Sequence, residues 1–275
     1  MIQETSFLKH YYAFIKLGLQ QAISYRTNFY LYRIGDVLGV LVSIYLWKAV
    51  FLSSKVEEIN NFNSEKIIYY IIISYITQLF VQTTCSIMIG EDVKEGSISM
   101  RLLKPVDLIT TYLFTEIGEK LMVLFTLGIP ITTIMIIIQC KSNTTIVLSL
   151  LHIIFYIFSI INAYLINFYI NICFGFSSFI LKNLWGVNFL KNVIVSFLSG
   201  SVIPLSFFPD KFGQILQFLP FSSMNFVPVM LFLGKYNALS SIRVILVQFF
   251  WLVVFVIISK IVWEKIKNYI TIQGG

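Results

Sequence analysis

Long apolar stretches, separated by short charged segments, set the pattern of this chain. Residues 67–90, 121–140 and 142–181 contain no Asp, Glu, Lys or Arg. A helix of about 20 apolar residues crosses the hydrocarbon core of a membrane, which is about 30 Å thick. Because the alternating pattern of a barrel strand is absent from these stretches, they predict membrane-spanning helices.

Six such helices fit the chain, and we expect an all-α polytopic membrane protein with a single transmembrane domain over residues 1–275. The predicted spans are residues 28–53, 66–90, 108–140, 145–181, 186–204 and 240–263. Pro130 is expected to kink the third span, because proline lacks the N–H that a helix interior requires. Residues 145–181 are too long for one straight span, and we expect a bend near Gly175.

The first 26 residues have a different pattern. Lys16, Gln20 and Ser24 repeat every four residues on one side of a helix, and aromatic residues line another side. A helix of this kind lies in the plane of the membrane interface. We therefore expect an N-terminal amphipathic interfacial helix over residues 3–26. The alternative is the frayed start of the first span.

Residues 205–235, between the fifth and sixth spans, combine apolar side chains with closely spaced prolines. Four of the six prolines lie in or next to this stretch: Pro204, Pro209, Pro220 and Pro228. No straight helix passes through prolines at this spacing, and a broken helix at membrane depth requires cover from protein. We expect two short helices that form an external re-entrant hairpin.

Residues 91–105 interrupt the apolar pattern with a charged segment. Its charged residues are Glu91, Asp92, Lys94, Glu95, Arg101 and Lys104. Gly96 is expected to break the chain, Ser97 to cap a short helix over residues 98–104, and Pro105 to end that helix. The segment is either an ordinary loop in water or a docking helix for a soluble partner.

Composition supports the membrane assignment. Hydrophobic residues make up 57% and charged residues 12% of the chain, whereas a soluble domain has about 25% charged residues. The three cysteines are scattered and form no CxxC pair, so neither a disulfide framework nor a zinc site is expected. No cleavable signal peptide is expected, because charges interrupt the first 36 residues.

The net charge of +7 indicates orientation in the membrane rather than nucleic acid binding. Cytoplasmic loops carry an excess of Lys and Arg. With the N-terminus inside, 12 of the 20 Lys and Arg residues lie on the inner side. Six lie on the outer side: Lys48, Lys55, Lys66, Lys141, Lys211 and Lys235. We expect both termini and residues 91–105 in the cytoplasm, and the hairpin outside.

A few ionisable residues lie within the predicted spans. Arg33 and Asp36 are three residues apart, so they either pair near the interface or place Asp36 on a substrate path. Glu116 and Lys120 are four residues apart with the acid first, the better orientation for an ion pair. That pair lies near the inner interface, or it lines a translocation path or a subunit interface. His152 stands alone and is expected to be a packed or interfacial residue rather than a metal ligand.

Two motifs in this layout resemble the permease subunits of ABC type 2 exporters. After the second predicted span, Glu95-Gly96 leads to Leu102-Leu103-Lys104-Pro105. After the fifth, Pro204 is followed by Phe207-Phe208-Pro209, Leu219-Pro220-Phe221 and Pro228. The motifs occur in this order on opposite sides of the membrane, and the six-span layout covers the whole chain.

The resemblance implies a role for each motif. The charged segment would be a coupling helix that inserts into a groove of a cytoplasmic ATPase. Its coupling residues would be Glu91, Asp92, Glu95, Gly96, Arg101, Leu102, Leu103 and Pro105. The hairpin would form an external gate made of Pro204, Phe207, Phe208, Pro209, Leu219, Pro220, Phe221 and Pro228. The N-terminal amphipathic helix would be the elbow helix that leads into the first span.

The resemblance also implies partners. The functional unit would contain two permeases, identical or homologous, and two ATPase subunits, in the bilayer of the bacterial cytoplasmic membrane. ATP and Mg would be bound by the ATPase subunits, and no cofactor or metal is expected in this chain. A phenylalanine-rich gate suits an amphipathic or apolar cargo, such as a peptide, an antibiotic or a lipid-like molecule.

The chain has no recognisable motif for chemistry of its own. A phosphate-binding loop requires G-x-x-x-x-G-K-[ST], whereas Gly234-Lys235 is followed by Tyr236 and lacks the upstream glycine. No HExxH motif occurs. We therefore expect a transport subunit rather than an enzyme. The alternatives are a secondary transporter that works without an ATPase, and a membrane immunity or scaffold protein.

Overall fold

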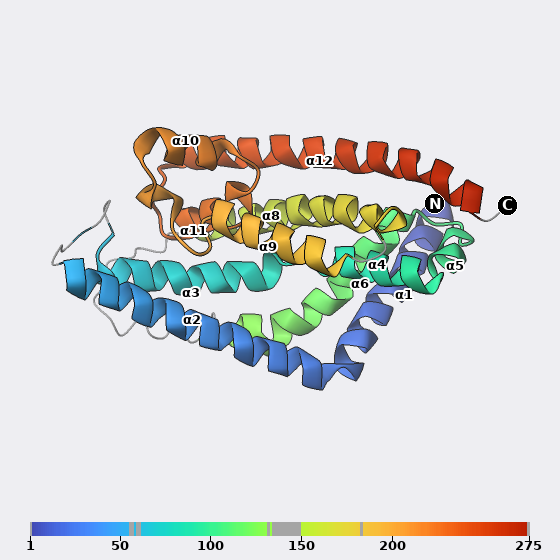
Figure 1. The fold of residues 1–275 in the computed structure, drawn as a ribbon, viewed down its shortest axis with the longest axis horizontal. Coiled ribbons are helices and arrows are strands. Elements are labelled where there is room, and N and C mark those ends of the chain that lie inside the picture. The colour runs from blue at the N-terminus through green and yellow to red at the C-terminus, as the bar shows by residue number, and fades with distance from the viewer. Residues whose placement is uncertain are drawn as a thin grey trace.

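The protein is an elongated bundle of helices. A computed structural model describes residues 2–54, 58, 62–130, 133, 150–181 and 184–273, and every regular element within these ranges is helical. Both ends of the described chain lie at one end of the bundle, beside the short helix α5 (Ile98–Leu102). Helices α10 (Asp210–Phe218) and α11 (Phe226–Phe232) lie at the opposite end (Figure 1).

Four helical stretches of the described chain are long and apolar enough to cross a membrane. They are Arg26–Ser54, Ser64–Glu95, Leu151–Phe179 and Ala238–Lys267, which correspond to the first, second, fourth and sixth predicted spans. The last belongs to α12 (Ala238–Gln273), whose 36 residues make a helix about 54 Å long. Helix α12 is therefore longer than the predicted 240–263 and extends well past a membrane core of about 30 Å.

The second stretch is two helices rather than one. Helix α3 (Ser64–Val81) ends before residues 82–84, and α4 (Cys85–Glu95) begins after them. The predicted span 66–90 has no such interruption, and the predicted charged loop begins where α4 is still helical. The helix continues to Glu95 because the first residue that breaks it is Gly96, whose φ of 75° lies in the left-handed region.

In the described structure the third predicted span is helical from Leu108 to Pro130. Helix α6 (Leu108–Val123) is followed by a π-helical turn, Leu124–Gly128, just before Pro130. The rest of the predicted third span and the start of the fourth, residues 145–149, lie outside the described residues. Helix α8 covers Leu150–Phe176 and passes into a 3-10 turn, Ser177–Phe179, close to the expected bend at Gly175.

Helix α9 (Trp185–Leu198) has 14 residues, too few to cross a membrane alone. The predicted fifth span reaches residue 204, but the helix ends at Leu198 because Gly200 adopts a φ of 78°. The six-span count therefore stays a prediction.

Helix α1 (Ile2–Ser24) occupies the range of the predicted interfacial helix and packs along α6. A Cβ added to Gly18 would lie 1.9 Å from the carbonyl oxygen of Thr115, and one on Gly118 would lie 2.1 Å from that of Ile15. The two glycines thus allow the backbones to touch. Helix α2 (Arg26–Ser54) follows after Tyr25 and diverges from α1 (Figure 1).

The core is divided along the bundle. At the end that carries α10 and α11, a cluster joins α2 and α3 to the hairpin, and it includes Trp47, Tyr70 and Phe226. At the end that carries α5, a second cluster joins α4, α5, α6, α8 and α12, and it includes Ile98 and Tyr112. Each predicted functional segment is therefore packed into its own part of the core.

Candidate functional site

The charged segment forms a corner between α4 and α5. Gly96 ends α4, and α5 begins two residues later and ends at Leu102. The predicted helix over residues 98–104 is therefore too long by two residues. Residues 104–106 form a turn in which the Val106 N–H donates to the carbonyl of Lys104, because Pro105 disfavours helical backbone at the residue before it.

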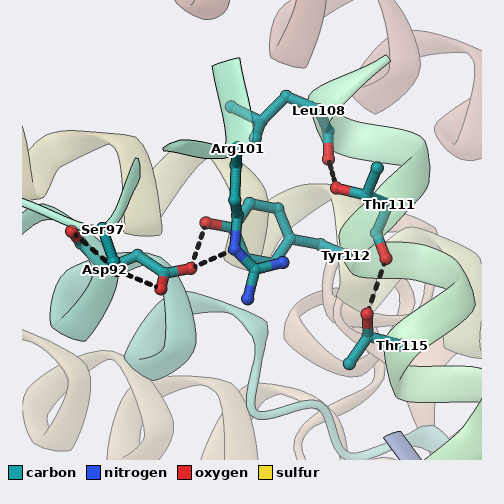
Figure 2. A network of polar contacts seen from close by, with 7 residues as sticks. All are labelled: Asp92, Ser97, Arg101, Leu108, Thr111, Tyr112 and Thr115. Atoms are coloured by element: carbon teal, nitrogen blue, oxygen red, sulfur yellow. Dashed lines mark hydrogen bonds and ion pairs between the residues drawn. The ribbon is translucent and has the colours of Figure 1, made fainter. Parts of the chain in front are cut away.

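Asp92 on α4 is the centre of a polar network that holds this corner together. Its Oδ2 pairs with Arg101 Nε at 2.8 Å and accepts a hydrogen bond of 2.6 Å from the Tyr112 hydroxyl. Its Oδ1 accepts one of 2.7 Å from Ser97 Oγ. Figure 2 shows Asp92 reaching all three partners, which come from the α4–α5 turn, α5 and α6. One carboxylate thereby ties α5 to two neighbouring helices.

The side chains of this network are largely shielded from solvent. The Arg101 and Asp92 side chains are 17% and 15% exposed, and the Arg101 guanidinium lies over the Tyr112 ring, 4.6 Å from its centroid. A shielded ion pair with additional hydrogen bonds is worth more than an exposed one, whose contribution is about 0–1 kcal/mol. The orientation of α5 is therefore well defined.

The predicted helix-capping role of Ser97 is wrong. Its side chain makes no cap hydrogen bond to α5; its hydroxyl donates to Asp92 instead. The reason is the backbone: Ser97 has φ −65° and ψ −18°, whereas a capping side chain usually requires an extended residue.

Helix α5 buries one apolar side chain and exposes its others. Ile98 is 4% exposed and packs into the core beneath the corner. Met100 is 70% exposed, Leu102 38% and Leu103 85%. Exposed apolar side chains on a short, fixed helix form a candidate docking surface for another protein.

The structure separates the predicted coupling residues into two groups. Asp92 and Arg101 meet in the network. The others lie exposed around the corner: Glu91, Glu95, Gly96, Leu102, Leu103 and Pro105. Sequence reasoning missed Tyr112 and Met100. Tyr112 lies 20 residues from Asp92 on another helix, so no local spacing signals their contact.

The interruption between α3 and α4, residues 82–84, is a second polar site. We call it the α3–α4 break. Glu116 of α6 is 1% exposed and faces it. Its Oε1 accepts a hydrogen bond of 2.6 Å from the Thr84 N–H and another from the Thr83 hydroxyl. Its Oε2 accepts one of 3.2 Å from the Tyr164 hydroxyl on α8.

Lys120, one turn further along α6, faces the other side of the break. Its Nζ donates to the carbonyl of Leu79 at 3.2 Å and to that of Gln82. The predicted Glu116–Lys120 ion pair is not among the salt bridges of the described residues, because each side chain bonds to backbone groups of the broken helix. The predicted Arg33–Asp36 pair is confirmed at 2.8 Å.

The predicted gate residues lie at the opposite end of the bundle. Phe207 packs edge-on against Trp47 and Phe62, with ring centroids 5.1 and 5.6 Å away. Phe208 packs against Phe197 and Phe212 at 5.5 and 5.6 Å. Pro204, Pro220 and Pro228 are buried, Phe207, Phe208, Leu219 and Phe221 are half-buried, and Pro209 is exposed.

Buried hydrogen bonds fix this hairpin to the rest of the bundle. The Tyr70 hydroxyl of α3 donates to the Gly200 carbonyl at 2.6 Å. Asn225 Nδ2 donates to Ser74 Oγ at 2.8 Å. Gln248 Nε2 of α12 donates to the Ser223 carbonyl at 2.9 Å. The end of the bundle that carries α10 and α11 is therefore closely packed, and the gate role of these residues stays a prediction.

His152, which the sequence marks as a packed residue, lies against Gly234. A Cβ on Gly234 would be 3.4 Å from its ring. Within the described residues, no three His, Cys, Asp or Glu side chains are grouped so that they could hold a metal ion.

Comparison with known proteins gives one result for the chain as a whole. A family described as ABC-2 family transporter protein matches residues 37–274. The match includes the charged corner, the α3–α4 break and the hairpin, and it begins within α2. No curated protein matches the chain.

Proposed function

This chain belongs to the ABC-2 family of transporter proteins, and from that premise we propose that it is the membrane-spanning permease subunit of an ATP-driven exporter. Permeases of this family generally work with separate ATPase partners. The proposed unit contains two cytoplasmic ATPase subunits, which bind ATP and Mg, and a second permease, identical or homologous. We propose the bacterial cytoplasmic membrane as its location.

The observation that carries this proposal is the apolar surface of α5. Met100 and Leu103 are 70% and 85% exposed on a helix that Asp92 holds in place. This surface lies at the end of the bundle where both chain ends lie (Figure 1). By the Lys and Arg count, that end faces the cytoplasm. A soluble ATPase is the partner that can reach it.

The opposite end supports export of an amphipathic or apolar cargo. Phe208 and Phe212 pack together in the hairpin, and Phe207 packs against Trp47 and Phe62. We propose that this hairpin is the external gate, which rearranges when the ATPases bind ATP. Peptides, antibiotics and lipid-like molecules are the cargo classes that match an aromatic lining, because aromatic side chains present large apolar surfaces.

The experiment is copurification of this chain with candidate ABC ATPase subunits from the same organism. The double variant Met100→Glu, Leu103→Glu places two charges in the docking surface. We expect it to bind the ATPase at least about tenfold more weakly, a loss of about 1.4 kcal/mol in binding free energy. Leu239→Glu is the matched control. Leu239 is also 70% exposed but lies at the start of α12, far from α5 (Figure 1).

Two outcomes would overturn the proposal. One is unchanged ATPase binding by the double variant while it remains folded. The other is a wild-type protein that binds no ATPase and still moves cargo, the behaviour of a secondary transporter. Loss of binding in the double variant but not in Leu239→Glu supports the proposal.

A further inference from the structure

We propose that Tyr112 and Glu116 are positioning residues that transmit movement of α5 to α6, that Lys120 holds the end of α3, and that the α3–α4 break lets α4 change direction relative to α3. The three residues are spaced by four, so they lie on one face of α6. This inference rests on the proposed function, because an ATPase must act on α5. It goes further by naming the path of the movement.

The break lies at a depth where an interruption is costly. Helix α3 has 18 residues, about 27 Å of helix, so the break lies near the inner edge of a membrane core about 30 Å thick. Interrupting a helix there leaves N–H and C=O groups without partners, and each costs several kcal/mol when it faces lipid. The break persists because side chains from two other helices supply those partners.

Lys120 and Asn167 supply donors at the end of α3. The Lys120 ammonium bonds the carbonyls of Leu79 and Gln82. Asn167 Nδ2 of α8 donates to the Val81 carbonyl at 2.8 Å. A cation at the C-terminal end of a helix is also favoured by the helix dipole.

Glu116 supplies the acceptor at the start of α4. Its carboxylate takes the Thr84 N–H at 2.6 Å, and the Thr83 hydroxyl, which also bonds this carboxylate, accepts the Cys85 N–H at 3.2 Å. The helix dipole also favours an anion at the N-terminal end of a helix, because that end carries a partial positive charge. The two charges of α6 thus match the two ends of the broken helix.

Tyr112 extends the same face of α6 to the α4–α5 corner. Its hydroxyl bonds Asp92, which also holds Arg101 of α5. Helix α6 is therefore attached to the α4–α5 unit (residues 85–102) at Asp92, and to Thr84, the residue that precedes α4. Its attachment to α3 is through Lys120. A displacement of α5 is carried to α6 by the contacts at Asp92 and Thr84. Helix α3 does not follow, because the α3–α4 break separates it from α4.

Tight packing links α6 to α1 and α4 to α8. Helix α1 is in backbone contact with α6 at Gly18 and Gly118, so we expect it to follow. Helix α4 also lies against α8, where a Cβ on Gly175 would meet Ile89 at 2.7 Å. The Ser86 hydroxyl of α4 also donates to Asn171 Oδ1 of α8 at 3.0 Å, so we expect α8 to respond to a displacement of α4.

The test measures distances within one labelled permease in the assembled permease–ATPase complex in nanodiscs, with and without ATP and vanadate. The spin labels are attached to non-canonical amino acids that are incorporated genetically in place of Glu65, Lys94 and Phe125. All three positions are exposed, and they mark the start of α3, the end of α4 and the turn after α6. Encoded labels leave the native cysteines in place.

We expect trapping with ATP and vanadate to change the 65–94 and 65–125 distances together, by about 2 Å or more, and to leave the 94–125 distance unchanged. In Glu116→Met, which removes the acceptor of the Thr84 N–H, we expect the 65–94 distance to change while the 65–125 distance no longer follows. In Lys120→Met, which removes only the bonds to Leu79 and Gln82, we expect the 65–125 distance still to follow. Glu119→Met is the matched control, because Glu119 accepts a hydrogen bond of 3.3 Å from the Thr84 hydroxyl, and that hydroxyl also bonds Glu116.

The outcomes separate this inference from the proposed function. A complex that binds and hydrolyses ATP with no change in the 65–125 distance, or with a changed 94–125 distance, overturns the inference and leaves the permease proposal standing. Failure to bind any ATPase overturns both. If Glu116→Met behaves as the wild type does, Glu116 has no positioning role and the inference is wrong.

Discussion

Tyr70 and Gly200 are 130 positions apart in the chain and are joined by a buried hydrogen bond of 2.6 Å from the phenol to the carbonyl oxygen. Gly200 lies two residues after the end of α9, and its φ of 78° turns the chain into the hairpin. Two constraints meet at this glycine. Its backbone is left-handed, and its carbonyl faces a tyrosine that is 1% exposed.

Gly200→Ala is therefore expected to destabilise the protein. A Cβ there would lie 3.0 Å from Leu205 and 3.2 Å from both Phe226 and the Tyr70 hydroxyl, and left-handed backbone costs a non-glycine residue about 1–2 kcal/mol. We expect the melting temperature to fall by at least about 3 °C. Thermal unfolding in detergent measures it. Gly186→Ala, where a Cβ meets nothing within 4 Å, is the control, and an equal effect of both substitutions would contradict the argument.

The contact between α1 and α6 gives a second prediction. Gly18→Leu and Gly118→Leu place side chains where a Cβ alone already collides with carbonyl oxygens at 1.9 and 2.1 Å. We expect α1 to detach and the yield of folded protein to fall severely. Gly35→Leu and Gly39→Leu on α2 are the matched controls, because nothing lies within 4 Å of either position. Size-exclusion profiles that do not distinguish the two pairs would refute a tight α1–α6 contact.

The Asp92 network predicts how α5 responds to a change of charge. Arg101→Met removes the cation that pairs with Asp92 at 2.8 Å and lies over Tyr112. Breaking a largely shielded charge pair costs about 1.5–3 kcal/mol, so α5 should become mobile and ATPase binding should weaken by roughly tenfold or more. Hydrogen exchange of residues 97–103 measures the first effect and titration with the ATPase the second. Lys94→Met removes an exposed charge from the same corner, and it should leave both measurements unchanged.

Much of this architecture follows from patterns that are local in the sequence. The charge-free stretches predict the long helices, because a membrane core selects apolar runs of defined length. The i, i+3 spacing of Arg33 and Asp36 predicts their ion pair, since both lie on one helix turn. The proline spacing after Pro204 predicts the short helices α10 and α11.

Other features depend on contacts between distant segments and have no local signal. Residues 82–84 contain neither Gly nor Pro, so nothing in their sequence predicts the break; Glu116, Lys120 and Asn167 stabilise it from α6 and α8. The i, i+4 spacing of Glu116 and Lys120 suggests an ion pair between them. In the structure, the two side chains instead bond the backbone at the start of α4 and at the end of α3. Ser97 likewise bonds Asp92, because the turn at Gly96 brings the hydroxyl to that carboxylate.

Lys191 and Asn171 provide the last prediction, which concerns a buried cation in α9. Lys191 is 7% exposed; its ammonium donates to Asn171 Oδ1 and lies 5.4 Å from the Phe174 ring centroid. No carboxylate in the described part of the chain forms a salt bridge with it. Asn171 Oδ1 also accepts from Ser86 Oγ at 3.0 Å, and Asn171 Nδ2 donates to the Asn167 carbonyl at 2.9 Å.

The two residues should respond in opposite ways to substitution. Lys191→Met removes a charge that is costly to bury and leaves Asn171 bonded to Ser86, so we expect unchanged or higher stability. Asn171→Leu leaves the ammonium buried without its acceptor, which costs about 3–5 kcal/mol. The double variant should recover most of that loss, because the stranded charge is gone. Thermal unfolding of the three proteins measures these differences. Destabilisation by Lys191→Met equal to that of Asn171→Leu would show that the lysine is a necessary part of the core.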